Sequence, residues 1–204
     1  FNEFDQSPIS NFIKNKVLNL IKKEIKKTDL IILSDFSYGV ITKKLVDTIN
    51  KFKTKNKNLI IVGDSQSSSQ IGDITKFSNI DLTTPTEYEI RLGLKDFSSG
   101  LVELGLQAIA QNISKNVIIT LNKEGILIQE GEEKFSTDKI AALSNVARDP
   151  AGAGDCFLSA CSMSFALNKN LWISSYIGSL AAAIQIQKVG NVPIKKNEIL
   201  NSLK

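Results

Sequence analysis

Short apolar runs alternate with amphipathic segments along most of this chain, and this alternation constrains the fold more than any other feature. Three of the runs have the length and composition of buried parallel strands, at residues 29–33, 59–62 and 80–84. Apolar residues at helical spacing predict helices around them, at 10–27, 42–55 and 101–112. The pattern predicts an α/β fold, with an open, mostly parallel sheet and helices on both faces.

The second half of the chain adds a turn and two helices rich in small residues. Runs at 117–121 and 126–128 are separated by four residues that end in Gly125, and this spacing predicts an antiparallel pair of strands. A buried helix is predicted after Asp155 and another at 172–188, followed by a short charged helix. The polar stretch 65–70 is interpreted as a loop rather than a linker, so residues 1–204 are expected to form a single domain.

Polar residues stand at the ends of the predicted strands. In open α/β sheets the ligand lies beyond the carboxyl ends of the strands, so these positions are candidates for a site. They are Asp35, Asp64, Thr86, Glu89 and Thr120. Thr86 and Glu89 also have the spacing of a capping box at a helix start. Asp35 and Asp64 are interpreted as turn formers in preference to catalytic groups.

The stretch Asp-Pro-Ala-Gly-Ala-Gly-Asp at 149–155 is the strongest candidate for chemistry. Pro150 prevents a helix from running through this point, and Gly152 and Gly154 allow the backbone to approach a ligand closely. A helix start directly behind them presents free N–H groups that suit a phosphate. Asp155 is then either a base that removes a proton from an attacking hydroxyl or simply a residue of the first helical turn. Its place among the strand-end polar residues favours the base.

The composition excludes several classes of chemistry. The chain has no His, which removes imidazole acid–base catalysis and His-ligated zinc. The net charge of +4 comes from lysines that alternate with polar residues, without an aromatic–basic stripe, so nucleic-acid binding is not expected. No apolar run is long enough to span a membrane. Cys156 and Cys161 are expected to be reduced thiols in a cytoplasmic protein.

Four motifs occur together in an order that resembles a known enzyme family. The stretch at 149–155 matches all but the second residue of the Asp-Thr-x-Gly-Ala-Gly-Asp signature of the ribokinase-like (PfkB-type) carbohydrate kinases. Residues 33–39 resemble a Leu-Ser-Asp-Tyr-x-Lys-Gly segment of heptose-phosphate kinases. Residues 84–89 resemble the family's Thr-Pro-Asn-x-x-Glu, and residues 120–125 its Thr-Leu-Gly-x-x-Gly. The resemblance covers nearly the whole chain.

The resemblance implies an ATP-dependent, magnesium-requiring kinase that phosphorylates a hydroxyl of a sugar or sugar phosphate, such as a heptose phosphate in lipopolysaccharide precursor synthesis. It implies Asp155 as the base and the amides of Gly152, Ala153 and Gly154 as the anion hole. The nucleotide-binding residues that it implies are Thr120, Asn122, Gly125, Ser179 and Gly190. Glu89, with Thr86, would hold magnesium through water.

The chain also departs from the family pattern. Thr86 stands in place of Asn, Tyr38 in place of Lys, Asn122 in place of Gly, and Ser179 in place of Asn or His. The family's Gly-Gly signature, sugar-binding Asp and β-sheet lid are not recognisable before Phe1. The chain therefore resembles the C-terminal two-thirds of such a kinase, and alone it is expected to be a poor enzyme.

Two alternatives to a sugar kinase stay open. The first is a non-catalytic nucleotide-binding or interaction domain that kept the fold while its site drifted. The second is a kinase for a nucleoside or a vitamin, because the shared motifs carry little information on the acceptor. Family members often dimerise through the lid, so the resemblance also leaves a homodimer open.

Overall fold

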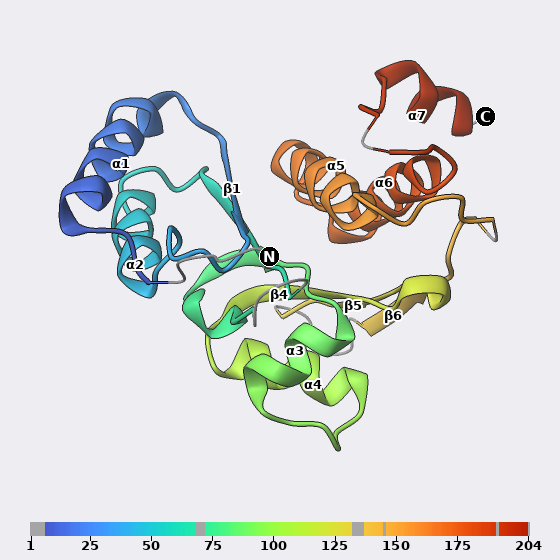
Figure 1. Ribbon diagram of the computed structural model, residues 1–204, viewed down its shortest axis with the longest axis horizontal. Coiled ribbons are helices and arrows are strands. Elements are labelled where there is room, and N and C mark those ends of the chain that lie inside the picture. Colours follow the sequence, from blue (N-terminus) through green and yellow to red (C-terminus); the bar gives the residue numbers. More distant parts are fainter. Residues whose placement is uncertain (1–6, 68–71, 132–136, 145, 191, 204) are drawn as a thin grey trace, which may run out of the picture.

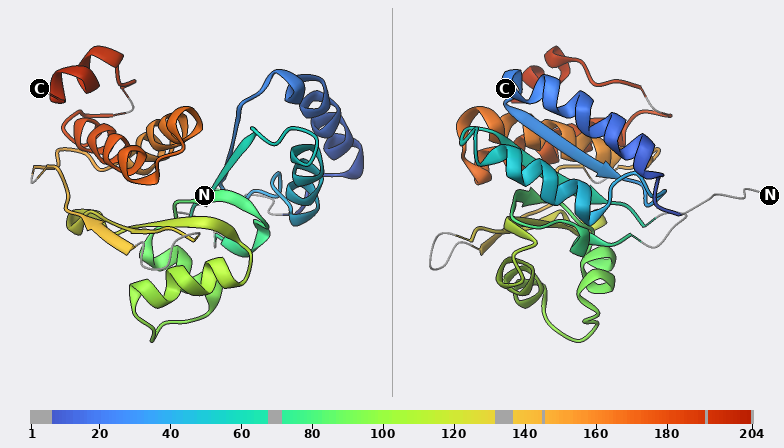
Figure 2. Two further views of the ribbon diagram at one scale, coloured as in Figure 1. Left: turned by 180° about the vertical axis from the view of Figure 1, so that it is seen from behind. Right: turned by 90° about the vertical axis from the view of Figure 1, so that its left-hand side faces the viewer.

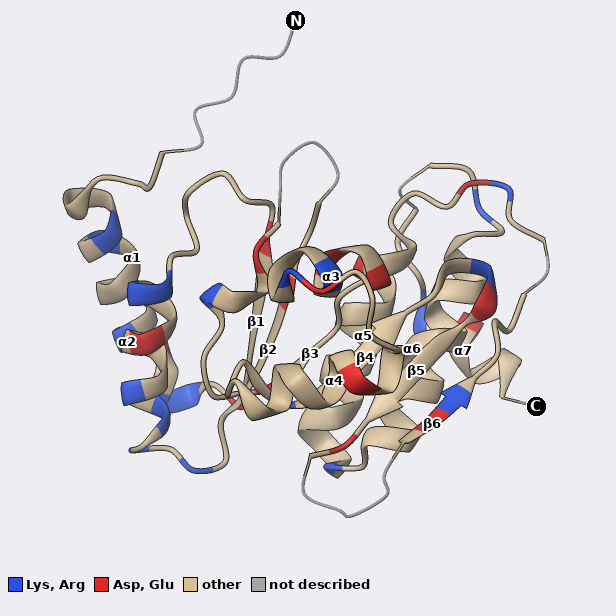
Figure 3. Cartoon of the chain, turned by 90° about the horizontal axis from the view of Figure 1, so that it is seen from below, with Lys and Arg blue, Asp and Glu red and all other residues tan. Residues whose placement is uncertain are grey.

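A computed structural model of the chain describes residues 7–67, 72–131, 137–144, 146–190 and 192–203. Within these residues the sheet has six strands in the order β1-β2-β3-β4-β5-β6 (Figures 1 and 3). Neighbours from β1 to β4 are parallel, whereas β4–β5 and β5–β6 are antiparallel. The strands are β1 (Leu30–Asp35), β2 (Ile60–Ser65), β3 (Ile80–Thr83), β4 (Ser114–Thr120), β5 (Ile126–Gln129) and β6 (Thr137–Ile140).

Helices cover both faces of the sheet, as the sequence predicts (Figure 2). The α-helices are α1 (Asn11–Glu24), α2 (Lys43–Lys53), α3 (Glu87–Leu94), α4 (Leu101–Ala110), α5 (Ala153–Asn168), α6 (Leu171–Gln185) and α7 (Lys196–Ser202). Short 3-10 helices are η1 (Ile25–Lys27), η2 (Ile74–Lys76) and η3 (Asn122–Glu124). One apolar core joins the sheet to α2, α3 and α4, with α1 packed against it, and a second joins the opposite face to α5 and α6.

Two helices, α1 and α3, begin at the residues expected to cap them. Ser10 Oγ accepts the N–H of Ile13 at 3.3 Å at the start of α1. At the start of α3, Thr86 Oγ1 accepts the N–H of Glu89 at 3.2 Å while the Glu89 carboxylate accepts the N–H of Thr86 at 2.8 Å. This reciprocal pair is the capping box that the sequence predicts.

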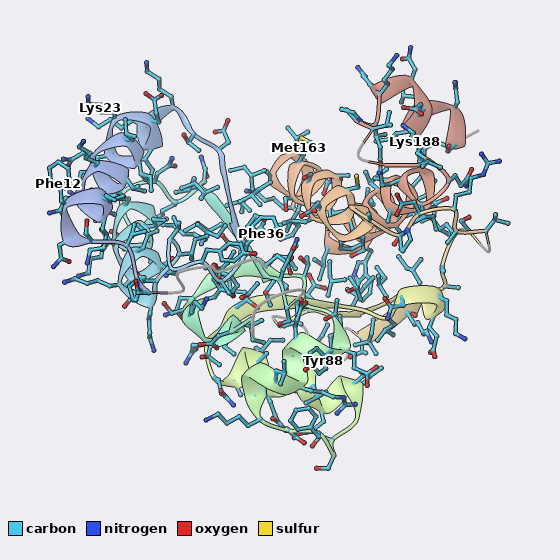
Figure 4. The ribbon with its side chains drawn as sticks, viewed as in Figure 1. Phe12, Lys23, Phe36, Tyr88, Met163 and Lys188 are labelled. Carbon is cyan, nitrogen blue, oxygen red and sulfur yellow. The ribbon has the colours of Figure 1, made fainter. Side chains whose placement is uncertain are left out.

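Small residues allow α5 and α6 to pack closely. A Cβ built on Gly178 of α6 would lie 2.9 Å from Cys161 Cβ and from the Phe157 ring of α5. The expectation that α5 is buried holds for one face only, because Met163 (Figure 4) and Leu167 on the opposite face are 55% and 88% exposed. The helix therefore covers the sheet as an outer layer and is not enclosed on all sides.

Two further details differ from the sequence-based expectations. Strand β6 was not predicted, and α5 begins at Ala153 instead of after Asp155, so Gly154 and Asp155 both belong to its first turn. Much of the loop expected at 65–70 lies outside the described residues. Across the described ranges, none of the helices combines the length and the apolar character that a membrane crossing requires.

Candidate active site

Two buried carboxylates, Asp35 and Asp64, lie at the carboxyl ends of β1 and β2. The turn after β2 donates hydrogen bonds to two further carboxylates, which belong to Asp155 and Glu89. Ser65 Oγ donates to Asp35 Oδ2 at 3.1 Å, and Asp35 also forms an ion pair with Lys76. The Gln66 side-chain amide donates to Asp155 Oδ1 at 2.8 Å. The backbone N–H of Ser67 donates to Glu89 Oε1 at 2.7 Å.

The first turn of α5 places Asp155 beside backbone N–H groups that have no backbone partner among the described residues. The hydrogen-bond ladder of the helix begins with Cys156 N–H to Gly152 O at 3.0 Å, so the N–H groups of Gly154 and Asp155 precede it. The N–H of Ala153, expected in the anion hole, instead donates to Pro150 O at 3.2 Å in this conformation. The helix start therefore presents fewer free donors than the motif alone implies.

The loop before α5 is fastened to the turn that follows α6. The Asp149 carboxylate accepts the N–H of Ala151 and the N–H of Gly190, each at 2.9 Å, and these bonds lower the pKa of Asp149. Lys188 (labelled in Figure 4) forms an ion pair with Glu198 Oε1 at 2.9 Å and so connects this turn to α7. Gly190 thus supports the loop, and among the described residues it does not line the cavity beside α5.

That cavity has a volume of about 560 Å³ and lies between the end of β4, the segment after β6 and the helices α5 and α6. Four of the five predicted nucleotide-binding residues line it: Thr120, Asn122, Gly125 and Ser179. Thr86, Ala153 and Gly154 line it as well. Ser179 Oγ is buried and has no hydrogen-bond partner among the described residues, so a ligand could supply one.

Gly125 is required by the closeness of β6. Its φ is +94°, and a Cβ at this position would lie 2.0 Å from the carbonyl oxygen of Ile140. Gly125 also accepts the N–H of Leu121 at 2.8 Å, which closes the turn between β4 and β5. The chain then runs from β6 through Ala142 and Leu143, which form a wall of the cavity.

Asp64 is the most electrostatically perturbed group of the site. Its Oδ1 is buried with no hydrogen-bond partner among the described residues. Burial, together with the charges of Glu89, Asp155 and Asp35, raises its pKa to about 8. The sequence suggested a turn former here, and only the fold shows how many carboxylates surround this side chain.

Magnesium fits this cluster best as a hydrated ion. In the described parts of the chain, no three His, Cys, Asp or Glu side chains are close enough together to hold a metal directly. Both Glu89 oxygens already accept backbone N–H groups, whereas Asp64 Oδ1 has no partner and would gain one from a metal-bound water. Such indirect binding is typical of magnesium, which keeps several of its waters.

The arrangement of the sheet is that of the ribokinase-like kinases. Ribokinase from Thermotoga maritima superposes with a TM-score of 0.71 at 22% identity, over 91% of this chain and 60% of that one. Phosphofructokinase-2 from Escherichia coli gives 0.76 at 15% identity, over 95% and 62%. Ribokinase from Arabidopsis thaliana, solved with ribose and ATP, gives 0.68 at 18% identity, over 97% and 60%.

The chain belongs to the pfkB family of carbohydrate kinases, whose sequence profile matches residues 4–197. Curated relatives include the bifunctional protein HldE of Sulfurimonas denitrificans, 27% identical over 187 residues, and that of Campylobacter jejuni, 27% identical over 199 residues. These matches cover 90% and 96% of this chain but only 37% and 41% of the relatives.

Proposed function

We propose that this chain forms the nucleotide-binding and phosphoryl-transfer part of an ATP-dependent kinase for a sugar or sugar phosphate. The observation that carries the proposal is the position of Asp155 at the start of α5, next to a 560 Å³ cavity and to backbone N–H groups without a backbone partner in the described part of the chain. Similarity to the HldE proteins supports a heptose phosphate as the acceptor.

Asp155 would act as the general base. Its carboxylate takes the proton of the acceptor hydroxyl while that oxygen forms a bond to the γ-phosphorus of ATP. The bond from the γ-phosphorus to the bridging oxygen breaks, and ADP leaves. The N–H groups at the start of α5, that of Gly154 first, would donate to the oxygens of the transferring group and stabilise its charge.

The nucleotide would occupy the cavity between the antiparallel strands and α6. Its walls include the apolar side chains of Ile126, Phe157 and Ile186, which suit a base, and the buried hydroxyl of Ser179 can provide a polar contact. Magnesium, when bound, would neutralise phosphate charge. Glu89 and Asp64 would hold it through water, with Thr86 at the same edge.

The test is ATP turnover by the full-length protein against a panel of pentoses, hexoses and heptoses, with and without a phosphate. Asp155→Asn should lower kcat by about 10²–10⁴-fold, the usual contribution of a general base. Asp29→Asn is the matched control, because Asp29 is exposed at the opposite end of β1, and it should leave turnover unchanged. Equal rates for the parent and Asp155→Asn would refute the assignment.

Calorimetry with ATP and magnesium separates a kinase from a drifted binding domain. The parent and Asp155→Asn should both bind the nucleotide, because Asp155 does not line the cavity. Binding without turnover on any acceptor would indicate a domain that kept the nucleotide site and lost the chemistry. The absence of binding at millimolar nucleotide would refute the cavity assignment.

A further inference from the structure

Gln66 contacts the carboxylate proposed as the base, although nothing in its sequence context indicates such a role. Its side-chain Nε2 donates to Asp155 Oδ1 at 2.8 Å, across 89 positions of the chain. The amide comes from the turn directly after β2, and the acid comes from the first turn of α5. The contact therefore connects the sheet to the catalytic helix start.

The backbone around Gln66 is fixed on both sides. The N–H of Gln66 donates to the carbonyl of Asp35 at 2.9 Å. The preceding residue, Ser65, is fully buried and bonds the Asp35 carboxylate, and the following residue, Ser67, bonds Glu89. Since β1 and α3 both anchor this turn, the Gln66 side chain starts from a defined position.

A neutral donor suits this location electrostatically. Asp64 on β2 is close enough to Asp155 for the two carboxyl groups to interact. Glu89 on α3 and Asp35 on β1 complete the cluster, and Asp35 is paired with Lys76 of η2. On its own helix, Asp155 is followed by Cys156, whose pKa is raised by burial and by Asp155. In such surroundings a neutral amide can occupy one oxygen of Asp155 without adding a further charge to the cluster.

We propose that Gln66 is a positioning residue for Asp155. Its amide occupies Oδ1 and fixes the plane of the carboxylate, so that the second oxygen remains for the proton of the acceptor hydroxyl. The inference rests on the proposed function, in which Asp155 is the base. Gln66 itself does not touch the reacting atoms.

The experiment compares Gln66→Met and Gln66→Glu with the parent in the full-length protein. Met keeps the length of the side chain without the donor. Hydrogen bonds to charged groups contribute enough for kcat to fall by about tenfold to a hundredfold, while the KM for ATP stays within about twofold. Gln107→Met is the matched control, because Gln107 of α4 donates to Asp96 Oδ2 at 3.0 Å in a similar pair of an amide and a carboxylate. It should leave kcat unchanged.

The pH profile distinguishes positioning from simple support of the turn. In Gln66→Glu the new side chain can donate to Asp155 only when it is protonated, so kcat relative to the parent should recover as the pH is lowered. Thermal unfolding of each variant monitors folding, and Gln66→Glu decides the question if Gln66→Met is unfolded at the assay temperature.

The possible negative results distinguish the positioning role of Gln66 from the kinase assignment itself. Parental kcat in Gln66→Met, or equal losses in kcat, ATP affinity and stability, would overturn the positioning role while the kinase assignment stands. The same relative kcat for Gln66→Glu at every pH would also overturn it. A parent protein that phosphorylates no acceptor would refute the proposed function, and this inference would fall with it.

Discussion

Substitution of Gly154 tests the proposed anion site at the start of α5. The change should impair binding of the phosphoryl group without destabilising the fold. It is the second residue of α5, and a Cβ built on it would meet no described atom within 4 Å. Its φ is outside the positive range in which a side chain is strained. Alanine is better than glycine inside a helix by about 0.5–1 kcal/mol. The free energy of unfolding of Gly154→Ala should therefore equal that of the parent or exceed it by up to this amount.

The added methyl group would project into the space that the transferring phosphoryl group is proposed to use. Gly154 lines the 560 Å³ cavity, and its N–H precedes the first ladder bond of α5. Loss of one oriented oxyanion donor typically lowers kcat by about 10²–10³-fold. This range is an upper bound for Gly154→Ala, since the N–H remains and only the approach of the phosphoryl group is obstructed.

The measurements are kcat and KM for ATP in the full-length protein, together with urea unfolding. Gly100→Ala is the matched control: Gly100 precedes α4, its Cβ would also meet nothing within 4 Å, and it does not line the cavity. Gly100→Ala should keep the parental kcat. If Gly154→Ala also keeps it, the assignment of the α5 start as the anion site is wrong. If the variant unfolds more easily than the parent, the unstrained helical position described for Gly154 is contradicted.

Two further predictions concern stability. Gly125→Ala should destabilise the fold by about 2 kcal/mol or more, since its Cβ would lie 2.0 Å from Ile140 O at a φ of +94°; an unchanged urea midpoint would contradict the close approach of β6. The pKa of Asp64 is raised from 3.8 to about 8, so the folded protein keeps a proton on this side chain that the unfolded chain releases above about pH 4. The contribution of Asp64 to stability therefore falls as the pH rises from about 4 to about 8. Asp64→Asn should flatten that fall by roughly 4 kcal/mol between about pH 5 and pH 8.5, as urea unfolding would show, and an unaltered pH dependence would exclude a buried protonated Asp64.

The regular part of the fold could be predicted because local patterns and tertiary packing agree there. The runs that became β1, β2 and β3 are apolar and end in polar residues, and Thr86 with Glu89 marks the start of α3 as a capping box. These features depend on neighbours within a few positions. A single sequence is enough to show them.

Strand β6 could not be predicted, because its four residues carry no strand pattern. Thr137, Asp138 and Lys139 are exposed, and only Ile140 is half-buried. The strand exists because β5 offers an edge with which it pairs antiparallel. The Gln66–Asp155 contact could not be predicted either, because the packing of distant elements brings its two residues together. The partner of the Ala153 N–H is set by the geometry of the turn at Pro150, which the motif does not reveal.

The parallel strands and the antiparallel strands of the sheet contribute different parts of the candidate site. The parallel strands bring Asp35 and Asp64 to one edge, and the antiparallel extension builds a wall of the cavity from Gly125 and the residues after β6. A bridge between Thr86 and Thr120 lies at the boundary, and both residues line the cavity. The proposed phosphoryl transfer needs a base on one side of the γ-phosphate and the nucleotide on the other, so the base would lie where these two parts meet. Asp155 has that position, since it bonds Gln66 of the parallel part while its neighbour Gly154 lines the cavity.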